Sequence, residues 1–187
     1  MSAKKIVITG GPSTGKTSVI KELEYRGYYC IPELVRGLTS EEKNVNGSEA
    51  IITNPILSVK DPYAFNNKLL HGRVAQYRSA EKTDEDIVFF DRGIPDVHAY
   101  MACFGQSYDA AFERPVHDLR YDRILLMPPW PDIYNTDAER FESFEESERI
   151  FTALRNTYQD FGYAITLIPI GSVTERTDFI LDLVKSE

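Results

Sequence analysis

The chain has few of the residues that build metal centres and disulfides. It contains two cysteines and three histidines in 187 residues. His71, His98 and His117 lack the spacing of metal ligands, which excludes a zinc site of the usual kinds. We expect Cys30 and Cys103 to pack as small core residues in a reducing compartment, without a disulfide.

Long apolar segments are also missing. No run approaches the roughly 18 residues that a transmembrane helix needs. The apolar stretch near the N-terminus, Ile6-Val7-Ile8-Thr9, is too short for the core of a signal peptide. We therefore expect a cytoplasmic protein without a transmembrane segment.

Positive charge is scarce as well. The chain has 21 Lys and Arg against 29 Asp and Glu, a net charge of -8. A general nucleic-acid binder usually carries a basic surface, so this balance argues against that function. The length and the 42% hydrophobic content fit one ordinary globular domain spanning residues 1–187. The sequence carries no indication of an oligomeric state.

Short apolar runs alternate with amphipathic segments. We expect strands at residues 6–9, 28–32, 87–90, 123–127 and 164–168. We expect helices at residues 17–26, 63–78, 144–161 and 174–185. Strands of this kind that alternate with helices predict an α/β fold whose parallel sheet is covered on both faces. Two polar stretches, residues 39–62 and a lid-like segment at about 130–145, interrupt the pattern and are long enough to be functional.

Residues Gly10–Thr17 match the motif G-x-x-x-x-G-K-[ST], between an expected strand and an expected helix. In such a loop, backbone N–H groups and the helix N-terminus hold phosphate oxygens. We expect Lys16 to reach the β- and γ-phosphates of ATP and the Thr17 hydroxyl to bind Mg²⁺. The expected nucleotide contacts are Gly11, Pro12, Ser13, Thr14, Gly15, Lys16, Thr17 and Ser18. The alternative is a glycine-rich turn with a solvated lysine.

Asp91 follows the apolar run at 87–90 and precedes Arg92. A carboxylate at the end of a buried strand beside a phosphate loop is well placed to hold Mg²⁺. It could instead start an ordinary turn. Arg92 could contact the phosphates of a substrate or pair with a surface acid.

Glu33 and Arg36 follow the second expected strand. Ligands of doubly wound sheets bind beyond the carboxyl ends of the strands, so Glu33 shares an edge with the phosphate loop and Asp91. A carboxylate there could accept a proton from a substrate hydroxyl or bind a metal-bound water. A solvated Glu–Arg pair fits the spacing equally well.

Asp137 and Arg140 precede the long helix at 144–161. An arginine on a segment that closes over ATP would neutralise charge on the transferred phosphoryl group. The alternative is a helix cap followed by a solvent-facing arginine. Trp130 and Tyr134 could wall a substrate pocket or simply pack the loop.

The order of these motifs resembles the small P-loop NTPases grouped with the nicotinamide riboside kinase domain of NadR and the TTD-type proteins. These AAA-like ATPases are related in fold to nucleoside and nucleotide kinases. The resemblance includes Gly10–Thr17, the pair Glu33 and Arg36, and Asp91-Arg92-Gly93. It continues through Pro128-Pro129-Trp130 and Asp137-x-x-Arg140 to the turn Gly171-Ser172-Val173, and so covers nearly the whole chain.

The resemblance implies a three-layer α/β/α fold with a five-stranded parallel sheet of nucleoside-monophosphate-kinase type. It implies Arg140 on a lid, a base at Glu33, a Mg²⁺-placing acid at Asp91, and Gly171 near the adenine. Some relatives bind GTP and phosphoinositides. The guanine motif N-K-x-D is not matched by Asn67-Lys68-Leu69-Leu70, which lacks the aspartate.

Two functions follow. The first is a Mg²⁺- and ATP-dependent kinase that phosphorylates a hydroxyl of a small, nucleoside-like acceptor. In it, Lys16, Glu33, Asp91 and Arg140 are the catalytic residues, and Glu33, Arg36, Arg92 and Asp137 bind the substrate. The second is a slow nucleotide-dependent switch whose partner is a protein or a phosphoinositide.

Overall fold

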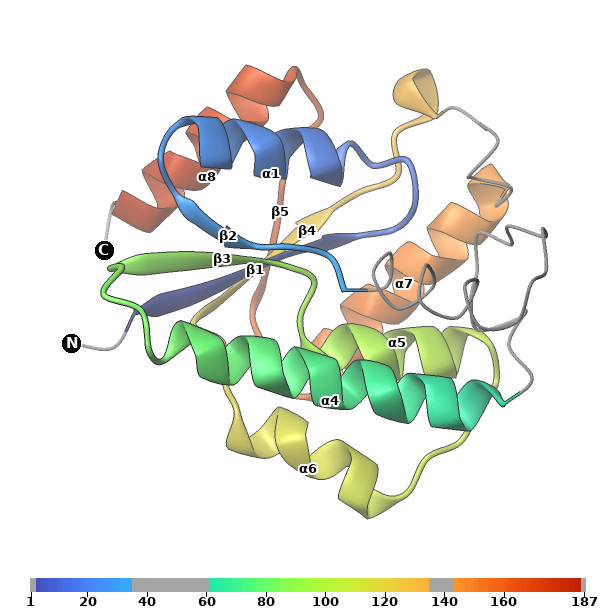
Figure 1. Cartoon of the computed structure of the whole chain (residues 1–187). Coiled ribbons are helices and arrows are strands. Elements are labelled where there is room, and N and C mark those ends of the chain that lie inside the picture. Colours follow the sequence, from blue (N-terminus) through green and yellow to red (C-terminus); the bar gives the residue numbers. More distant parts are fainter. Residues whose placement is uncertain (1–2, 35–60, 135–142, 186–187) are drawn as a thin grey trace, which may run out of the picture.

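Five parallel strands form the sheet at the centre of the computed structural model, which describes residues 3–34, 61–134 and 143–185. The strands are β1 (Lys4–Gly10), β2 (Tyr29–Ile31), β3 (Ile87–Asp91), β4 (Arg123–Met127) and β5 (Ile165–Leu167). Their order is β2-β3-β1-β4-β5 (Figure 1). Central β1 pairs Val7 with Phe90 on one side and Ile124 on the other. Because all neighbours are parallel, every strand ends at the same edge, which confirms the predicted sheet.

The helices of the described ranges agree closely with the expected ones. They are α1 (Lys16–Tyr25), α4 (Pro62–Ala80), α5 (Ile94–Cys103), α6 (Ala110–Asp118), α7 (Phe144–Asp160) and α8 (Val173–Lys185), with a short 3-10 helix η1 (Pro131–Ile133). Helices α5 and α6 were not among the expected helices, and in α6 Pro115 interrupts the sequence pattern. Within the described ranges, no helix combines the length and the apolar character needed to cross a membrane.

Several predicted boundaries differ from the observed ones by one or two residues. The polar loop expected at 39–62 reaches one residue too far, because Pro62 is already the first residue of α4. The Asp61 side chain caps this helix by accepting a hydrogen bond of 2.9 Å from the backbone N–H of Ala64. Proline is favoured at the first helical position, where its missing N–H costs nothing. The remainder of that loop, residues 39–60, lies outside the described residues.

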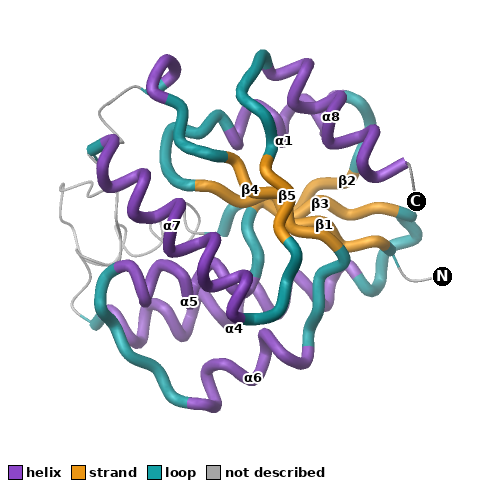
Figure 2. The backbone as a smooth tube through the Cα atoms, turned by 180° about the vertical axis from the view of Figure 1, so that it is seen from behind, coloured by secondary structure: helices purple, strands orange, loops and turns teal. Residues whose placement is uncertain are grey.

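Helices cover both faces of the sheet because side chains alternate along each strand. On β1, Ile6 and Ile8 pack in one apolar cluster with α1 and α8, while Val7 packs in another with α4, α5 and α7. Figures 1 and 2 show the two helical layers on opposite sides of the strands, with α6 outside α5. The three-layer α/β/α fold is therefore confirmed.

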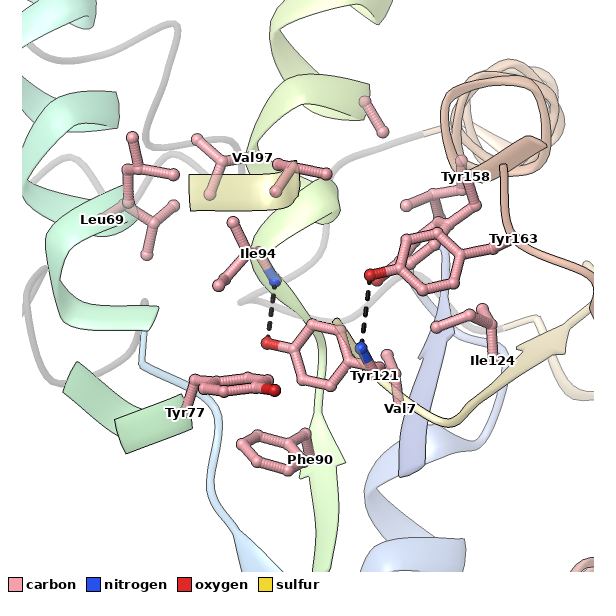
Figure 3. Packing of buried hydrophobic residues seen from close by; sticks show 14 of the residues in the cluster. Val7, Leu69, Tyr77, Phe90, Ile94, Val97, Tyr121, Ile124, Tyr158 and Tyr163 are labelled. Carbon is pink, nitrogen blue, oxygen red and sulfur yellow. Dashed lines mark hydrogen bonds between the residues drawn. The ribbon is translucent and has the colours of Figure 1, made fainter. Parts of the chain in front are cut away.

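Tyr121, just before β4, joins several elements on the α4–α5–α7 side of the sheet. Its hydroxyl accepts a hydrogen bond of 3.2 Å from the N–H of Ile94, the first residue of α5, and its own N–H donates to the Tyr163 hydroxyl at 3.3 Å (Figure 3). Its ring stands edge-on to Tyr77 and Phe90, each 5.2 Å away. The N–H groups of a first helical turn lack intrahelical partners, so Tyr121 satisfies one of them and fixes where α5 begins.

Both cysteine thiols are free. Cys30 is buried in β2 and Cys103 is half-buried at the end of α5. Burial raises the pKa of Cys30 to about 12, so its thiol stays protonated and packs as an apolar group.

His98 is a buried imidazole on α5. Its side chain is 0% exposed and lies edge-on to Tyr108, Phe112 and Phe161, with ring centroids 5.0 to 5.2 Å away. Burial lowers the pKa of His98 below its ordinary value of 6.5. The folded protein therefore favours the neutral ring more strongly than the unfolded chain does.

We expect this burial to make stability depend on pH. As the pH falls through 6.5, the unfolded chain takes up a proton at His98 before the folded chain does, so the free energy of unfolding decreases. Urea denaturation from about pH 8 to about pH 5 measures that slope. His98→Gln should flatten it, whereas the control His71→Gln, at an exposed position, should not. An unchanged slope in His98→Gln would contradict the assignment.

Candidate functional site

The loop Gly10–Thr17 joins β1 to α1 in a conformation suited to an anion. Ser13 and Gly15 have left-handed backbone angles, with φ of 56° and 80°, and the Thr14 hydroxyl donates to the Gly11 carbonyl at 3.1 Å. Helix α1 has no side-chain cap and no acidic residue in its first turn. Its positive end is therefore neither capped nor neutralised, as in loops that hold phosphate oxygens. The structure places the predicted contacts Gly11, Pro12, Ser13, Thr14, Gly15, Lys16, Thr17 and Ser18 in this loop and the first turn of α1.

Lys16 and Asp91 form a buried ion pair at this edge of the sheet. Nζ of Lys16, at the start of α1, lies 2.9 Å from Oδ1 of Asp91, at the end of β3. Their side chains are only 10% and 8% exposed. Oδ1 of Asp91 accepts no well-directed hydrogen bond from the described residues, so charge attraction holds the pair. A bound phosphate or cation can therefore replace either partner.

Glu33 lies just beyond β2 and is held by two arginines. Its Oε1 accepts from Nη2 of Arg73 at 2.9 Å, and its Oε2 accepts from Nε of Arg92 at 2.5 Å. Arg73, on α4, is 2% exposed and also donates to the Asp91 carbonyl at 3.3 Å. The predicted residues Glu33, Asp91 and Arg92 thus lie together at one edge.

Asp96 connects this group to the rest of the molecule. Its Oδ1 accepts from the Thr9 hydroxyl at 2.5 Å and from Nη1 of Arg92 at 3.3 Å. Its Oδ2 accepts from the Gly93 N–H at 2.9 Å and from the Tyr158 hydroxyl at 2.5 Å. The Asp96 carboxylate, which is 2% exposed, thereby joins β1, α5 and α7, and both of its oxygens accept hydrogen bonds.

Arg92 holds a strained backbone conformation. Its φ of 75° lies in the left-handed region, which costs a residue other than glycine about 1–3 kcal/mol. Its guanidinium is fixed by Glu33 and Asp96 and lies 5.2 Å from the centre of the Tyr100 ring. Burial alone would lower its pKa, but Tyr100, Glu33 and Asp96 raise the pKa well above its ordinary value. Glu33 and Asp96 also raise the pKa of Arg73 against the effect of its burial, so both arginines stay charged.

A small cleft lies on the other side of β1, beside the ends of β4 and β5. Thr14, Trp130, Ile170 and Arg176 are among the residues that line it. Gly171 belongs to the turn between β5 and α8, directly after Ile170. The loop Gly10–Thr17 therefore separates two regions, one with Asp91 and Glu33 and one with Trp130 and Arg176.

Helix α7 contacts the phosphate loop. Its N-cap, Ser143, accepts from the N–H of Glu146 at 3.1 Å, and the Ser147 hydroxyl donates to the Pro12 carbonyl at 3.2 Å. Three predicted site residues, Arg36, Asp137 and Arg140, lie outside the described residues, and so do residues 135–142 of the lid-like segment.

Sequence reasoning missed Arg73, Asp96 and Arg176. Arg73 comes four residues after Leu69, on the apolar stripe of α4, and a cation on such a stripe was a usable signal. Asp96 lies three residues after Gly93, at a position where an acid can cap a helix. Neither pattern identifies the partner, because the pairing depends on the topology of the sheet.

Solved structures with the same fold include several kinases. A thymidylate kinase from Candida albicans matches with a TM-score of 0.67 and 14% identity, over 99% of this chain and 92% of that one. A deoxyadenosine kinase from M. mycoides with bound dATP matches with a TM-score of 0.67 and 14% identity, over 97% and 99%. The NadR protein in complex with NR matches with a TM-score of 0.72 and 18% identity, over 99% of this chain but 51% of NadR.

Sequence comparison identifies the family. No curated protein sequence matches the chain. Residues 5–176 match the family described as an AAA domain, which is most of the chain. This match and the kinase-like neighbours confirm the resemblance to small P-loop NTPases. The chain therefore belongs to the AAA domain family and has the P-loop fold of nucleoside and nucleotide kinases.

Proposed function

We propose that this protein is a kinase that transfers the γ-phosphoryl group of Mg²⁺-bound ATP to a hydroxyl of a nucleoside-like acceptor. The observation that carries the proposal is the position of Glu33. Its carboxylate lies at the same edge as the phosphate loop and is held by Arg92, directly after Asp91. A nucleotide switch needs the phosphate loop, whereas a kinase also needs a group that orients the acceptor hydroxyl, and Glu33 lies where such a group would act.

The phosphate loop supplies the donor site of this proposal. Its N–H groups and the uncapped end of α1 would hold the phosphates of ATP. Lys16 would leave Asp91 and stabilise the charge that develops on the transferred group. A deoxyadenosine kinase with bound dATP and a NadR with NR share the fold, which supports a nucleotide donor and a nucleoside-like acceptor.

Asp91 and Thr17 fit a magnesium ion. Mg²⁺ usually takes one or two protein ligands together with phosphate oxygens and waters. Asp91 offers a buried carboxylate oxygen that charge attraction alone holds to Lys16, and Thr17 offers a hydroxyl in the first turn of α1. When bound there, the ion would neutralise part of the negative charge of the phosphates.

Glu33 would act on the acceptor. Glu33 is held by Arg73 and Arg92 at the edge of the sheet where the acceptor hydroxyl would have to lie, and a carboxylate can accept a hydrogen bond from a hydroxyl. In that position it orients the hydroxyl for attack on the γ-phosphorus and can take its proton. Arg36 and Asp137 would contact the acceptor, and Arg140 would close over the phosphates.

The direct test measures turnover of Mg²⁺-ATP with and without a panel of nucleosides, nucleotides and sugars. We expect one class of acceptor to raise turnover strongly. Lys16→Ala should lower the stimulated rate about 10²–10³-fold, because a charged donor to the transferred group is lost. Lys21→Ala, an exposed change on the same helix, is the control and should behave like wild type.

A flat, slow rate across the whole panel, together with tight nucleotide binding, would contradict the kinase. It would favour the nucleotide-dependent switch with a protein or phosphoinositide partner. Limited proteolysis with and without nucleotide then measures whether the segments at 39–62 and 130–145 change.

Glu33→Gln tests the acceptor side separately. We expect kcat to fall about 10²–10⁴-fold, because the amide cannot take the proton, while the KM for ATP changes little. Glu24→Gln, at an exposed position, is the matched control. Thermal melting of Glu33→Gln measures whether the variant stays folded when Arg73 and Arg92 face a neutral amide instead of a carboxylate. Acceptor-dependent turnover equal to wild type in a folded Glu33→Gln would show that Glu33 has no such role.

A further inference from the structure

Arg176 is a buried cation whose contacts differ from those of the other buried arginines. It lies on α8 and is 5% exposed. Its hydrogen bonds go to backbone carbonyls, from Nη1 to Thr14 at 2.9 Å and from Nε to Ser172 at 3.4 Å. Arg73 and Arg92, by contrast, are neutralised by Glu33 and Asp96. Among the described residues, no carboxylate forms an ion pair with Arg176.

The charge of Arg176 lies against the phosphate loop. A Cβ atom built on Gly15 would lie only 2.8 Å from Nη1 and Nη2 of Arg176, so the guanidinium touches the backbone at the start of α1. Burial lowers the pKa of Arg176 from its ordinary value of 12.5 and no neighbouring acid opposes this. An isolated buried charge is unfavourable unless something of opposite charge binds nearby. The N-terminus of α1, which is positive, lies beside Arg176. We therefore expect the opposite charge to come from an anion that the loop binds.

Arg176 also lies on the side of the loop where the rest of a nucleotide must go. Asp91 and Glu33 follow β3 and β2, on one side of β1, so the transferred γ-phosphate points to that side. The remainder of the donor then extends toward β4 and β5, where Arg176 and Trp130 line the cleft. Cζ of Arg176 is 5.6 Å from the centre of the Trp130 ring, a cation–aromatic contact that fixes the guanidinium plane.

We propose that Arg176 is a positioning residue for the donor nucleotide. Its hydrogen bond to the Thr14 carbonyl keeps the loop in a conformation whose N–H groups are free to bind phosphate. Its positive charge, on the far side of the loop, attracts the α- and β-phosphates. It touches no reacting atom, so it acts on binding more than on the chemical step. This inference rests on the proposed nucleotide-binding function.

Binding of Mg²⁺-ADP and Mg²⁺-ATP by the full chain, measured by calorimetry, tests the assignment. Arg176→Met keeps the length and apolar stem of the side chain but removes its charge and hydrogen bonds. We expect it to raise the Kd of both nucleotides about 10–100-fold, and to a similar extent because Arg176 is remote from the γ-phosphate. Arg176→Lys keeps the charge and should recover part of the lost affinity. In Arg176→Met, kcat at saturating ATP should stay within about threefold of the wild-type value.

Trp130 supplies an independent readout because it is the single tryptophan of the chain. Nucleotide binding to wild type should change its emission, and the same titration in Arg176→Met should show the weakened Kd. Arg155→Met, at an exposed position on α7, is the matched control and should bind like wild type.

Three results would overturn the assignment. If Arg176→Met bound both nucleotides with unchanged Kd values, Arg176 would be a packing residue without a role in nucleotide binding. A loss of kcat without a change in Kd would assign it to the chemical step instead. If wild type itself bound neither nucleotide, the proposed function would fail together with this inference, and that outcome is recognised without any variant.

Discussion

The pairing of the buried Arg73 and the largely buried Arg92 with two carboxylates holds the carboxyl edge of the sheet together. Arg73 and Arg92 meet Glu33, and Arg92 also meets Asp96. Removing one partner of a buried pair leaves an uncompensated charge and costs about 3–5 kcal/mol, so the four groups must be arranged together. They come from the ends of β2 and β3 and from α4 and α5, which fixes those elements relative to one another.

The proposed function assigns a different role to each half of this edge. The β2–β3 half holds Glu33 between Arg73 and Arg92, and the proposed function places the acceptor hydroxyl there. The β4–β5 half holds Arg176 and Trp130 beside the phosphate loop, and the proposed function places the remainder of the donor nucleotide on this side. Parallel strands make the division possible, because every strand delivers its following residues to the same edge.

The sequence was sufficient to predict the five strands, four of the helices and the phosphate loop, because these follow from local periodicity and one specific motif. It also placed Glu33 and Asp91 at a common edge, since parallel strands require it. The contact between Glu33 and Arg73 could not be predicted, because it joins residues 40 positions apart through the packing of α4 on the sheet. Arg176 meets Thr14 across 162 positions for the same reason. Both arginines nevertheless lie four residues from a buried apolar residue of their helix, Leu69 or Ile180, so a cation on a buried stripe is a signal to search for a partner.

A crystal structure of the full chain with Mg²⁺ and a non-hydrolysable ATP analogue tests this division most directly. We expect the triphosphate in the loop Gly10–Thr17, with its γ-phosphate on the side of Asp91 and Glu33 and its base on the side of Trp130 and Arg176. Lys16 should have left Asp91 for the phosphates. A nucleotide bound in the opposite direction, with its base beside Glu33, would contradict both the acceptor site and the role of Glu33.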